Sequence, residues 1–313
     1  MTTGKLQRYY DRNTDLFLRI GSSGSAMALH RGLWGPGVSN GEQAARFVHQ
    51  LIADAIRKRR PAAHPLRILD LGCGVGGTLF DLARHLENTH LTGITLSARQ
   101  VEIAHAAALR LGLSEQCGFL QGDFEEIRLG TKVEVILALE SFAHTARPDR
   151  FLATCAAHLV DGGLLIVIDD FLGQEPSAIT DRRDRDLIGT FRAGWHLPAL
   201  STLDEFLVLS ASAGFRAVDS RDLSPLIRTR RPRDRLVAAV SPIAQRLGLM
   251  HLPFWSNVIG GNALNSAIRG GLIRYCMTVA EFHSSDGENS VSPEQSAVPA
   301  TGNPRGACSS NGC

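Results

Sequence analysis

The chain has 313 residues, of which 44% are hydrophobic and 20% are charged, and its formal net charge is +2. This composition is typical of a globular protein with enough apolar residues for a sizeable core. The near balance of charge does not demand a nucleic-acid partner, and no apolar run is long enough to predict a membrane span. No signal-peptide pattern is present, so we expect a cytoplasmic protein.

The first 60 residues predict a helical lid. Apolar residues recur at helical spacing near the N-terminus, and a loop rich in Gly and Ser follows over 21–41. A second helix is expected from about Ser39, where Glu42 offers a capping box, and the basic stretch 57–60 ends it. We interpret residues 1–60 as one N-terminal segment.

Short apolar runs then alternate with helical segments. Strands are expected at 67–71, 91–95, 117–121, 133–139 and 164–169, and helices at 78–86, 99–111 and 151–159. This alternation predicts βαβ units around a buried parallel sheet. The predicted fold is therefore α/β, a Rossmann-like doubly wound and mostly parallel sheet with 61–172 as its core.

The remaining chain predicts three further parts. Residues 173–270 form a helical cap insertion with late core elements, which include a strand at 215–219 and helices over 224–262. An apolar run at 271–283 predicts the last core strand. Residues 284–313 are rich in Ser, Gly, Pro and Asn, so we predict a disordered tail that cannot bury enough surface to offset ordering entropy.

The strongest local signal is the segment from Asp70 to Thr78, which reads Asp-Leu-Gly-Cys-Gly-Val-Gly-Gly-Thr between the first strand and its helix. Glycines let the backbone turn tightly and approach a ligand, and the helix N-terminus presents unpaired N–H groups to it. The pattern Gly72-x-Gly74-x-x-Gly77 also matches the dinucleotide fingerprint, so this segment alone leaves the cofactor open.

Two further segments separate the alternatives. A dinucleotide enzyme usually places an acid at the end of the second strand to hold a ribose, but residues 93–97 here read Gly-Ile-Thr-Leu-Ser. After the third strand comes Gly122-Asp123-Phe124, where a carboxylate could accept an adenine amine and a ring could cover the base.

Together these segments resemble the class I S-adenosylmethionine-dependent methyltransferases over about residues 5–282. In that family, segment 70–77 resembles the motif that holds the methionine part of the cofactor, and 122–124 resembles the adenine-binding motif. Segment 93–100 is similar to a subgroup that includes sterol, tocopherol, geranyl diphosphate, cyclopropane-fatty-acid and sugar methyltransferases. The resemblance implies S-adenosyl-L-methionine as cofactor, held by Asp70, Gly72, Gly74, Gly76, Thr95, Leu96, Gln100, Asp123, Phe124 and Leu139.

Candidates for the chemistry follow the fourth and fifth strands, because ligands of such sheets bind at the carboxyl ends of strands. Glu140 and His144 could face the transferred methyl. Asp169 and Asp170 point to opposite sides of their strand, so at most one of them faces the pocket, and resemblance to sugar methyltransferases implies that it is Asp170. By resemblance to sugar O-methyltransferases, His144 is the expected base. Each residue also has an alternative role. His144 could cap or pack against the start of a helix, Glu140 could support the cofactor, and Asp170 could cap a helix or be a solvated charge.

Other candidates belong to the lid and the cap. Tyr9, Tyr10, His30 and Trp34 resemble the lid of the same subgroup, where Tyr-Tyr-Asp and His-x-Gly-x-Trp recur, with core packing as the alternative. Trp195 and His196 are expected at the acceptor pocket. A basic run could grip a diphosphate or form a solvated helix start: Arg228, Arg230, Arg231, Arg233 and Arg235.

These features predict methyl transfer to carbon or oxygen of a small, lipophilic, isoprenoid-like specialised metabolite. A sugar or natural-product O-methyltransferase is the first alternative. An NAD(P)-dependent oxidoreductase, or a member that binds cofactor without turnover, is the second. We expect a small-molecule acceptor and no nucleic acid, and leave a homo-oligomer open. The six cysteines show no C-x-x-C spacing, so we predict free thiols and no metal site.

Overall fold

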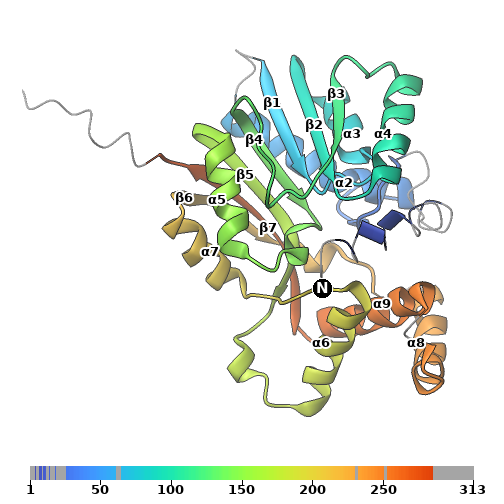
Figure 1. Ribbon diagram of the computed structural model, residues 1–313. Helices are drawn as coiled ribbons and strands as arrows, with labels where there is room; N and C mark the ends of the chain where they lie inside the picture. Colours follow the sequence, from blue (N-terminus) through green and yellow to red (C-terminus); the bar gives the residue numbers. More distant parts are fainter. Residues whose placement is uncertain are drawn as a thin grey trace, which may run out of the picture.

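A mostly parallel sheet organises the part of the chain that the computed structural model describes, namely residues 26–60, 65–229, 232–249 and 252–284 with residues 4, 7, 8, 10, 11, 14 and 18. Its seven strands run in the order β3-β2-β1-β4-β5-β7-β6 (Figure 1). Their bounds are β1 Leu66–Leu71, β2 Thr89–Thr95, β3 Cys117–Gln121, β4 Val133–Leu139, β5 Leu159–Leu172, β6 Phe215–Asp222 and β7 Ile273–Phe282. The predicted tail lies outside the described residues from 285 onward.

The strand order reverses at β1, which pairs in parallel with both β2 and β4. Such a switch point leaves a crevice at the carboxyl ends of the strands, where ligands of doubly wound sheets bind. β7 runs antiparallel between β5 and β6. The predicted Rossmann-like sheet is therefore confirmed, and the last strand in the sequence lies inside the sheet.

Both faces of the sheet are buried by helices because strand residues alternate between two apolar clusters. Ile68 packs with the helices α2 (Gly41–Arg59), α3 (Gly77–His85) and α4 (Ala98–Leu111). Its neighbour Leu69 packs with α5 (Pro148–His158) and α7 (Leu203–Ser212) on the other side. Burial on both faces explains why these strands read as continuous apolar runs.

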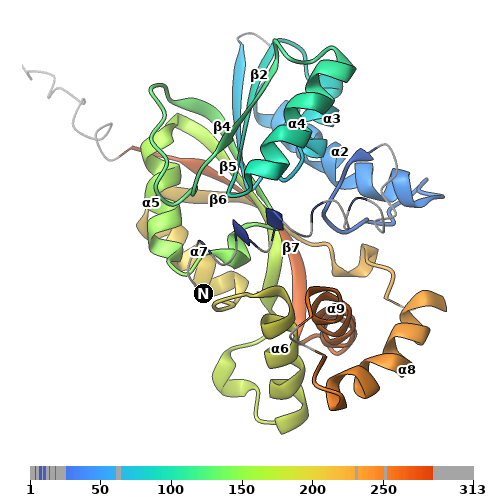
Figure 2. The same ribbon diagram turned by 45° about the vertical axis from the view of Figure 1, so that its right-hand side comes forward.

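The cap lies below the sheet and consists of α6 (Arg182–Trp195), α8 (Pro232–Arg246) and α9 (Pro253–Arg269) (Figures 1 and 2). α6 and α9 pack closely, since a Cβ on Gly194 would lie 2.6 Å from the Cα of Gly260. The β5–β7 ladder continues to the pair Leu172–Ile273, and Leu172 and Ile273 both belong to the apolar cluster of the cap. The cap is therefore continuous with β5 and β7, the two strands that lie between β4 and the edge strand β6.

Two sequence expectations need correction. The N-cap of α2 is Asn40, whose side chain accepts a hydrogen bond from Gln43 N, so the predicted Ser39–Glu42 capping box is wrong. The Gln43 side chain instead accepts hydrogen bonds from Ser39 N and Oγ. β5 also extends beyond the predicted 164–169 at both ends, because its first residue pairs with β4 and its last residues pair with β7.

Candidate functional site

The loop after β1 turns through glycines in the left-handed region, with φ of 90° at Gly72 and 86° at Gly76. A side chain is strained in this region and has no space here either. A Cβ on Gly72 would lie 2.4 Å from Ser141 Cβ, and one on Gly76 would lie 2.7 Å from the Phe119 ring. The loop therefore requires glycine, and it delivers the N-terminus of α3 to the switch point.

Asp70 is the last residue but one of β1, next to this loop. Its side chain is 1% exposed, and its Oδ1 atom has no hydrogen-bond partner among the described residues. Burial raises the pKa of Asp70 to about 7. A buried carboxyl oxygen without a donor is costly, so this position is built to receive a donor from a bound molecule.

The turn after β2 is closed by side chains rather than open to a ligand. Gln100 is 3% exposed, and its amide joins Thr95 Oγ1 at 2.5 Å and Thr14 Oγ1 at 3.2 Å. Ser97 Oγ donates to Asp11 Oδ1 at 2.5 Å. In this arrangement Gln100 holds the turn. Asp11, which stood only as the acid of the Tyr-Tyr-Asp element with no role of its own, brings the carboxylate that the end of β2 lacks.

The predicted adenine-binding pair follows β3. Asp123 Oδ1 accepts a hydrogen bond from Glu125 N at 3.0 Å, and the half-buried Phe124 ring meets Phe151 edge-on at 5.8 Å between centroids. Leu96, half-buried after β2, and Leu139, buried at the end of β4, complete the predicted set. All of these residues lie at the carboxyl ends of β1 to β4, as the sequence predicts.

An ion-pair cluster joins the N-terminal segment to the ends of β4, β5 and β7. Arg31 donates from Nη1 and Nη2 to the two oxygens of Asp170 at 2.7 and 2.5 Å, and from Nε and the backbone N to Glu140 Oε1 at 3.2 and 2.9 Å. Tyr275 donates to the same Glu140 oxygen at 2.9 Å, and the guanidinium lies 4.4 Å from its ring centroid.

This cluster shifts the pKa values of the two carboxylates that the sequence predicts at the site, Glu140 and Asp170. Burial alone would raise the pKa of Glu140, but the charge of Arg31, the interaction with His30 and the hydrogen bonds from Arg31 N and Tyr275 together outweigh it, and the pKa is lowered. Burial raises the pKa of Asp170, and Arg31 opposes that rise. Glu140 also has a φ of 51°, a strained value for a residue with a side chain. Both carboxylates are therefore engaged by Arg31.

His144 is placed differently. It ends the short helix η2 (Phe142–His144), and its Nε2 lies 3.1 Å from the hydroxyl of Tyr10. Its Nδ1 is buried and has no partner among the described residues. Burial, with a smaller contribution from His196, lowers the pKa of His144 to about 4. At neutral pH the imidazole is uncharged, and it can accept a proton.

The predicted lid histidine, His30, lies against a buried relay. Its Nε2 is 2.7 Å from His49 Nε2, and His49 Nδ1 is 2.7 Å from Asp81 Oδ2. Asp81 also accepts hydrogen bonds from Arg46 and Arg84. The relay links α2 and α3 to the residue before Arg31, so it anchors the N-terminal segment.

Loss of the relay carboxylate is expected to destabilise the protein. Asp81→Ala removes the buried carboxylate that pairs with both His49 and Arg46, and breaking a buried ion pair costs about 3–5 kcal/mol of unfolding free energy. Glu42→Ala is the matched control, because Glu42 is the exposed partner of the same arginine and should cost under about 1 kcal/mol. Urea unfolding measures both, and equal losses would contradict a special role for the relay.

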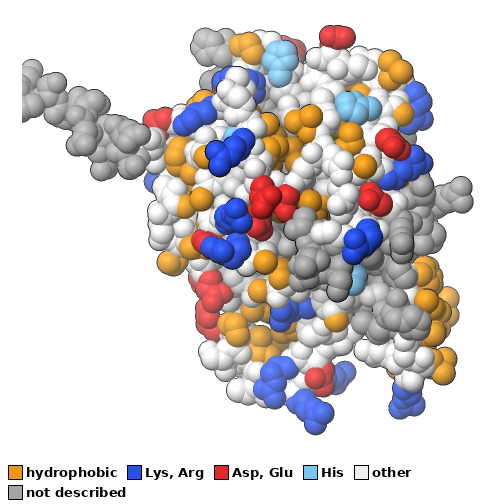
Figure 3. All heavy atoms as spheres, viewed as in Figure 1, with side chains coloured by type: hydrophobic (Ala, Val, Ile, Leu, Met, Phe, Trp, Pro, Cys, Tyr) orange, Lys and Arg blue, Asp and Glu red, His pale blue; other side chains and the backbone are white. Residues whose placement is uncertain are grey.

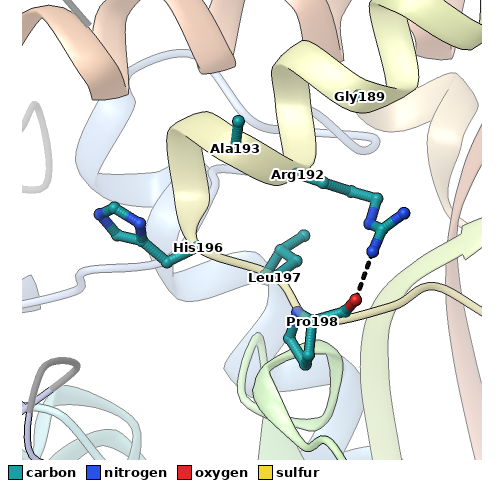
Figure 4. Close-up of a pocket in the computed structure, with 6 residues that line it drawn as sticks. All are labelled: Gly189, Arg192, Ala193, His196, Leu197 and Pro198. Carbon is teal, nitrogen blue, oxygen red and sulfur yellow. Dashed lines mark hydrogen bonds between the residues drawn. The ribbon is translucent and has the colours of Figure 1, made fainter. Parts of the chain in front are cut away.

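The remaining predicted residues lie at the lid and cap. The Arg228 guanidinium stacks on the Trp34 ring at 3.5 Å, and the Trp195 ring lies 5.9 Å from the Arg31 guanidinium. His196 lines a cavity of about 340 Å³ at the end of α6, where Arg192 donates to the Pro198 carbonyl (Figure 4). Tyr9, Arg230 and Arg231 lie outside the described residues, as do the side chains of Arg233 and Arg235.

Comparison with known proteins identifies this arrangement. Residues 68–163 match the family described as a methyltransferase domain. The sterol 24-C-methyltransferase of Neurospora crassa is 27% identical over 225 residues, which cover 70% of this chain and 55% of that protein. An O-methyltransferase of Pyrenophora dematioidea is 27% identical, with coverage of 70% and 78%. The crystal structure of the [4+2]-cyclase SpnF is 26% identical, with a TM-score of 0.67 and coverage of 91% and 97%.

Residues 68–163 therefore carry a methyltransferase domain, and the chain as a whole is similar to class I S-adenosylmethionine-dependent methyltransferases. It spans just over half the length of the sterol methyltransferase that it matches. The residues present fit the cofactor of these methyltransferases. The Asp70 oxygen that has no partner among the described residues suits the ammonium of its methionine part, and the N-terminus of α3, whose first N–H groups have no partner within the helix, suits its carboxylate.

Proposed function

We propose that this methyltransferase moves the methyl group of S-adenosyl-L-methionine to an oxygen of a small lipophilic acceptor, with His144 as the general base. One observation carries the proposal: an uncharged imidazole after β4 whose Nδ1 is buried and has no partner among the described residues. If Nε2–H donates to Tyr10, Nδ1 presents a lone pair to an acceptor hydroxyl.

The state of the carboxylates favours oxygen over carbon. Methylation of an alkene carbon produces a cation, which a free carboxylate beside the reacting carbon would stabilise. Glu140 and Asp170 are both engaged by Arg31, so their charge is already compensated. The relatives include both a sterol 24-C-methyltransferase and an O-methyltransferase, and they leave this choice open.

A cavity of about 710 Å³ supports a lipophilic acceptor. It reaches Asp170 and lies between η2 and α7, with apolar walls that include Phe142, Leu200, Phe206 and Leu209. This volume suits a drug-sized or terpenoid-sized molecule. The isoprenoid-like acceptor that the sequence predicts would fit such walls.

The chain's residues would act by alignment and proton removal. When bound, the cofactor supplies an electrophilic methyl on its sulfonium. Asp70 and the glycine loop would orient it, Tyr10 would hold the His144 ring, and Nδ1 would take the proton of the acceptor hydroxyl. Arg31 would fix the N-terminal segment over the ends of β4 and β5, which excludes water.

A second candidate is a cyclisation without methyl transfer. The likeness to the [4+2]-cyclase covers 91% of this chain, and the engagement of both carboxylates by Arg31 suits a shaped, non-transferring pocket. Such an enzyme would consume a polyene acceptor without producing S-adenosylhomocysteine.

The test uses S-adenosylmethionine carrying a ¹³C methyl group and a panel of hydroxylated terpenoids, sterols and macrolides. Formation of S-adenosylhomocysteine with a ¹³C signal of an O-methyl group is expected. A C-methyl signal would contradict the assignment of the nucleophile. Substrate conversion without S-adenosylhomocysteine would support the cyclase instead.

A further inference from the structure

The cap helix α8 carries a stripe of solvent-exposed apolar side chains. Leu236 and Ile243 are 66% and 59% exposed, and Leu247 in the turn that ends the helix is 69% exposed. Leu247 N donates to Ile243 O at 3.0 Å, so the helical path continues to this residue. Residues spaced by seven and four share one helix face. The opposite face of α8 buries Ser241 and Ala244.

Apolar side chains are also exposed at the start of α9. Leu252 and Phe254 are 41% and 44% exposed, and Trp255 beside them is half-buried. Figure 3 shows hydrophobic side chains gathered at the right-hand edge of the molecule, where Figure 1 places α8. Scattered apolar residues are normal on protein surfaces, but three on one helix face with two more at the start of the next helix indicate an interaction surface.

The same part of the sequence is strongly basic. Residues 228–249 contain six arginines and one acid, Asp234, which gives this segment a formal charge of +5. The whole chain has a net charge of +2, so the rest of it is acidic by three charges. Arg246 and Arg269, at the ends of α8 and α9, are exposed.

We propose that α8 and the start of α9 form a docking surface for an anionic lipid bilayer. An amphipathic helix with leucine-type residues on one face and arginines around it lies in the headgroup layer, held by apolar burial and by attraction to anionic lipids. Among the described residues no helix is both long and apolar enough to cross a membrane, so the contact is a surface one. This inference does not depend on the proposed reaction.

A second copy of the chain is the weaker occupant. Pairing two stripes face to face would bring two segments of charge +5 together, and their repulsion opposes association. An anionic bilayer compensates the same charge. Charge complementarity therefore selects the lipid.

The test is co-sedimentation of the full chain with vesicles of phosphatidylcholine, alone or mixed with phosphatidylglycerol. We expect binding to the anionic vesicles and its weakening in high salt. Ile243→Glu/Leu247→Glu should reduce binding by roughly tenfold or more, because it removes apolar contact and adds negative charge. The control is Leu109→Glu/Val208→Glu, which alters two residues of 74% and 70% exposure on α4 and α7 and should bind normally.

Three results would overturn the proposal. Absence of binding to anionic vesicles rejects it outright, and equal loss in the control pair shows that any added charge suffices. A change of molecular mass by light scattering that the α8 substitutions abolish, without vesicle binding, assigns the stripe to a second copy. Circular dichroism melting confirms that each variant folds, and a blue shift of tryptophan emission on binding that Trp255→Phe removes locates the contact.

Discussion

His144→Gln is expected to lower kcat by about 10²- to 10⁴-fold, the range that a general base contributes, while the Kd for S-adenosylhomocysteine stays unchanged. Glutamine can keep the bond to Tyr10 but cannot take a proton from a hydroxyl. Stopped-flow or endpoint assays give kcat, and calorimetric titration gives the Kd.

The matched control for this prediction is His90→Gln, because His90 is exposed at the start of β2, the strand end away from the site. It should leave both constants unchanged. If His144→Gln keeps kcat within about threefold of the unmodified enzyme, His144 is not the base, and Tyr10 or a carboxylate must be reconsidered.

Asp70→Asn is expected to weaken S-adenosylhomocysteine binding by about ten- to hundred-fold. A hydrogen bond to a charged group contributes about 1.5–3 kcal/mol, and the amide removes the charge that the ammonium would meet. Calorimetric titration measures the effect, with NADH as a ligand that should not bind. Glu134→Gln, which alters a carboxylate at the opposite end of β4, is the control and should bind normally.

The same residue predicts a pH dependence. The pKa of Asp70 in the cofactor-free protein is raised to about 7, so the carboxyl is largely protonated below that pH. Cofactor affinity should therefore rise as pH increases through about 7. Because the folded pKa lies above the unfolded one, stability of the cofactor-free protein should fall over the interval between about 4 and 7 as pH rises. In Asp70→Asn, the dependence of affinity on pH should be lost.

The sheet and the glycine loop could be predicted because their signals are local. Apolar runs of strand length and the glycines from Gly72 to Gly77 each carry their meaning within about ten residues. The start of α2 shows the limit of such signals. Ser39 and Asn40 are neighbours, and both residue types are good N-caps. The sequence alone does not choose between them, and the structure shows that Asn40 is the N-cap because its side chain accepts the hydrogen bond from Gln43 N.

The connections of the site could not be predicted because they join distant segments. Arg31 lies 109 and 139 residues from the two carboxylates that it binds, and it stood only as a variable position within His-x-Gly-x-Trp. Asp11 and His49 were missed for the same reason. A charged residue on the apolar face of two adjacent helices, as with His49 and Asp81, was a signal that could have revealed the relay.

The uninterrupted β5–β7 ladder has a mechanical consequence for how substrates reach the enzyme. The two strands pair from Leu164–Glu281 to Leu172–Ile273, and Gly173 N extends the contact to Leu272 O at 2.9 Å. A hinge between the cap and the sheet would have to break hydrogen bonds at its pivot. The wall of the proposed acceptor cavity next to β5 is therefore continuous with the sheet. The N-terminal segment is instead joined to the site by side chains, among them Arg31 on Asp170, Asp11 on Ser97 and Tyr10 on His144, so a ligand that enters past it would displace side-chain contacts and leave the ladder intact.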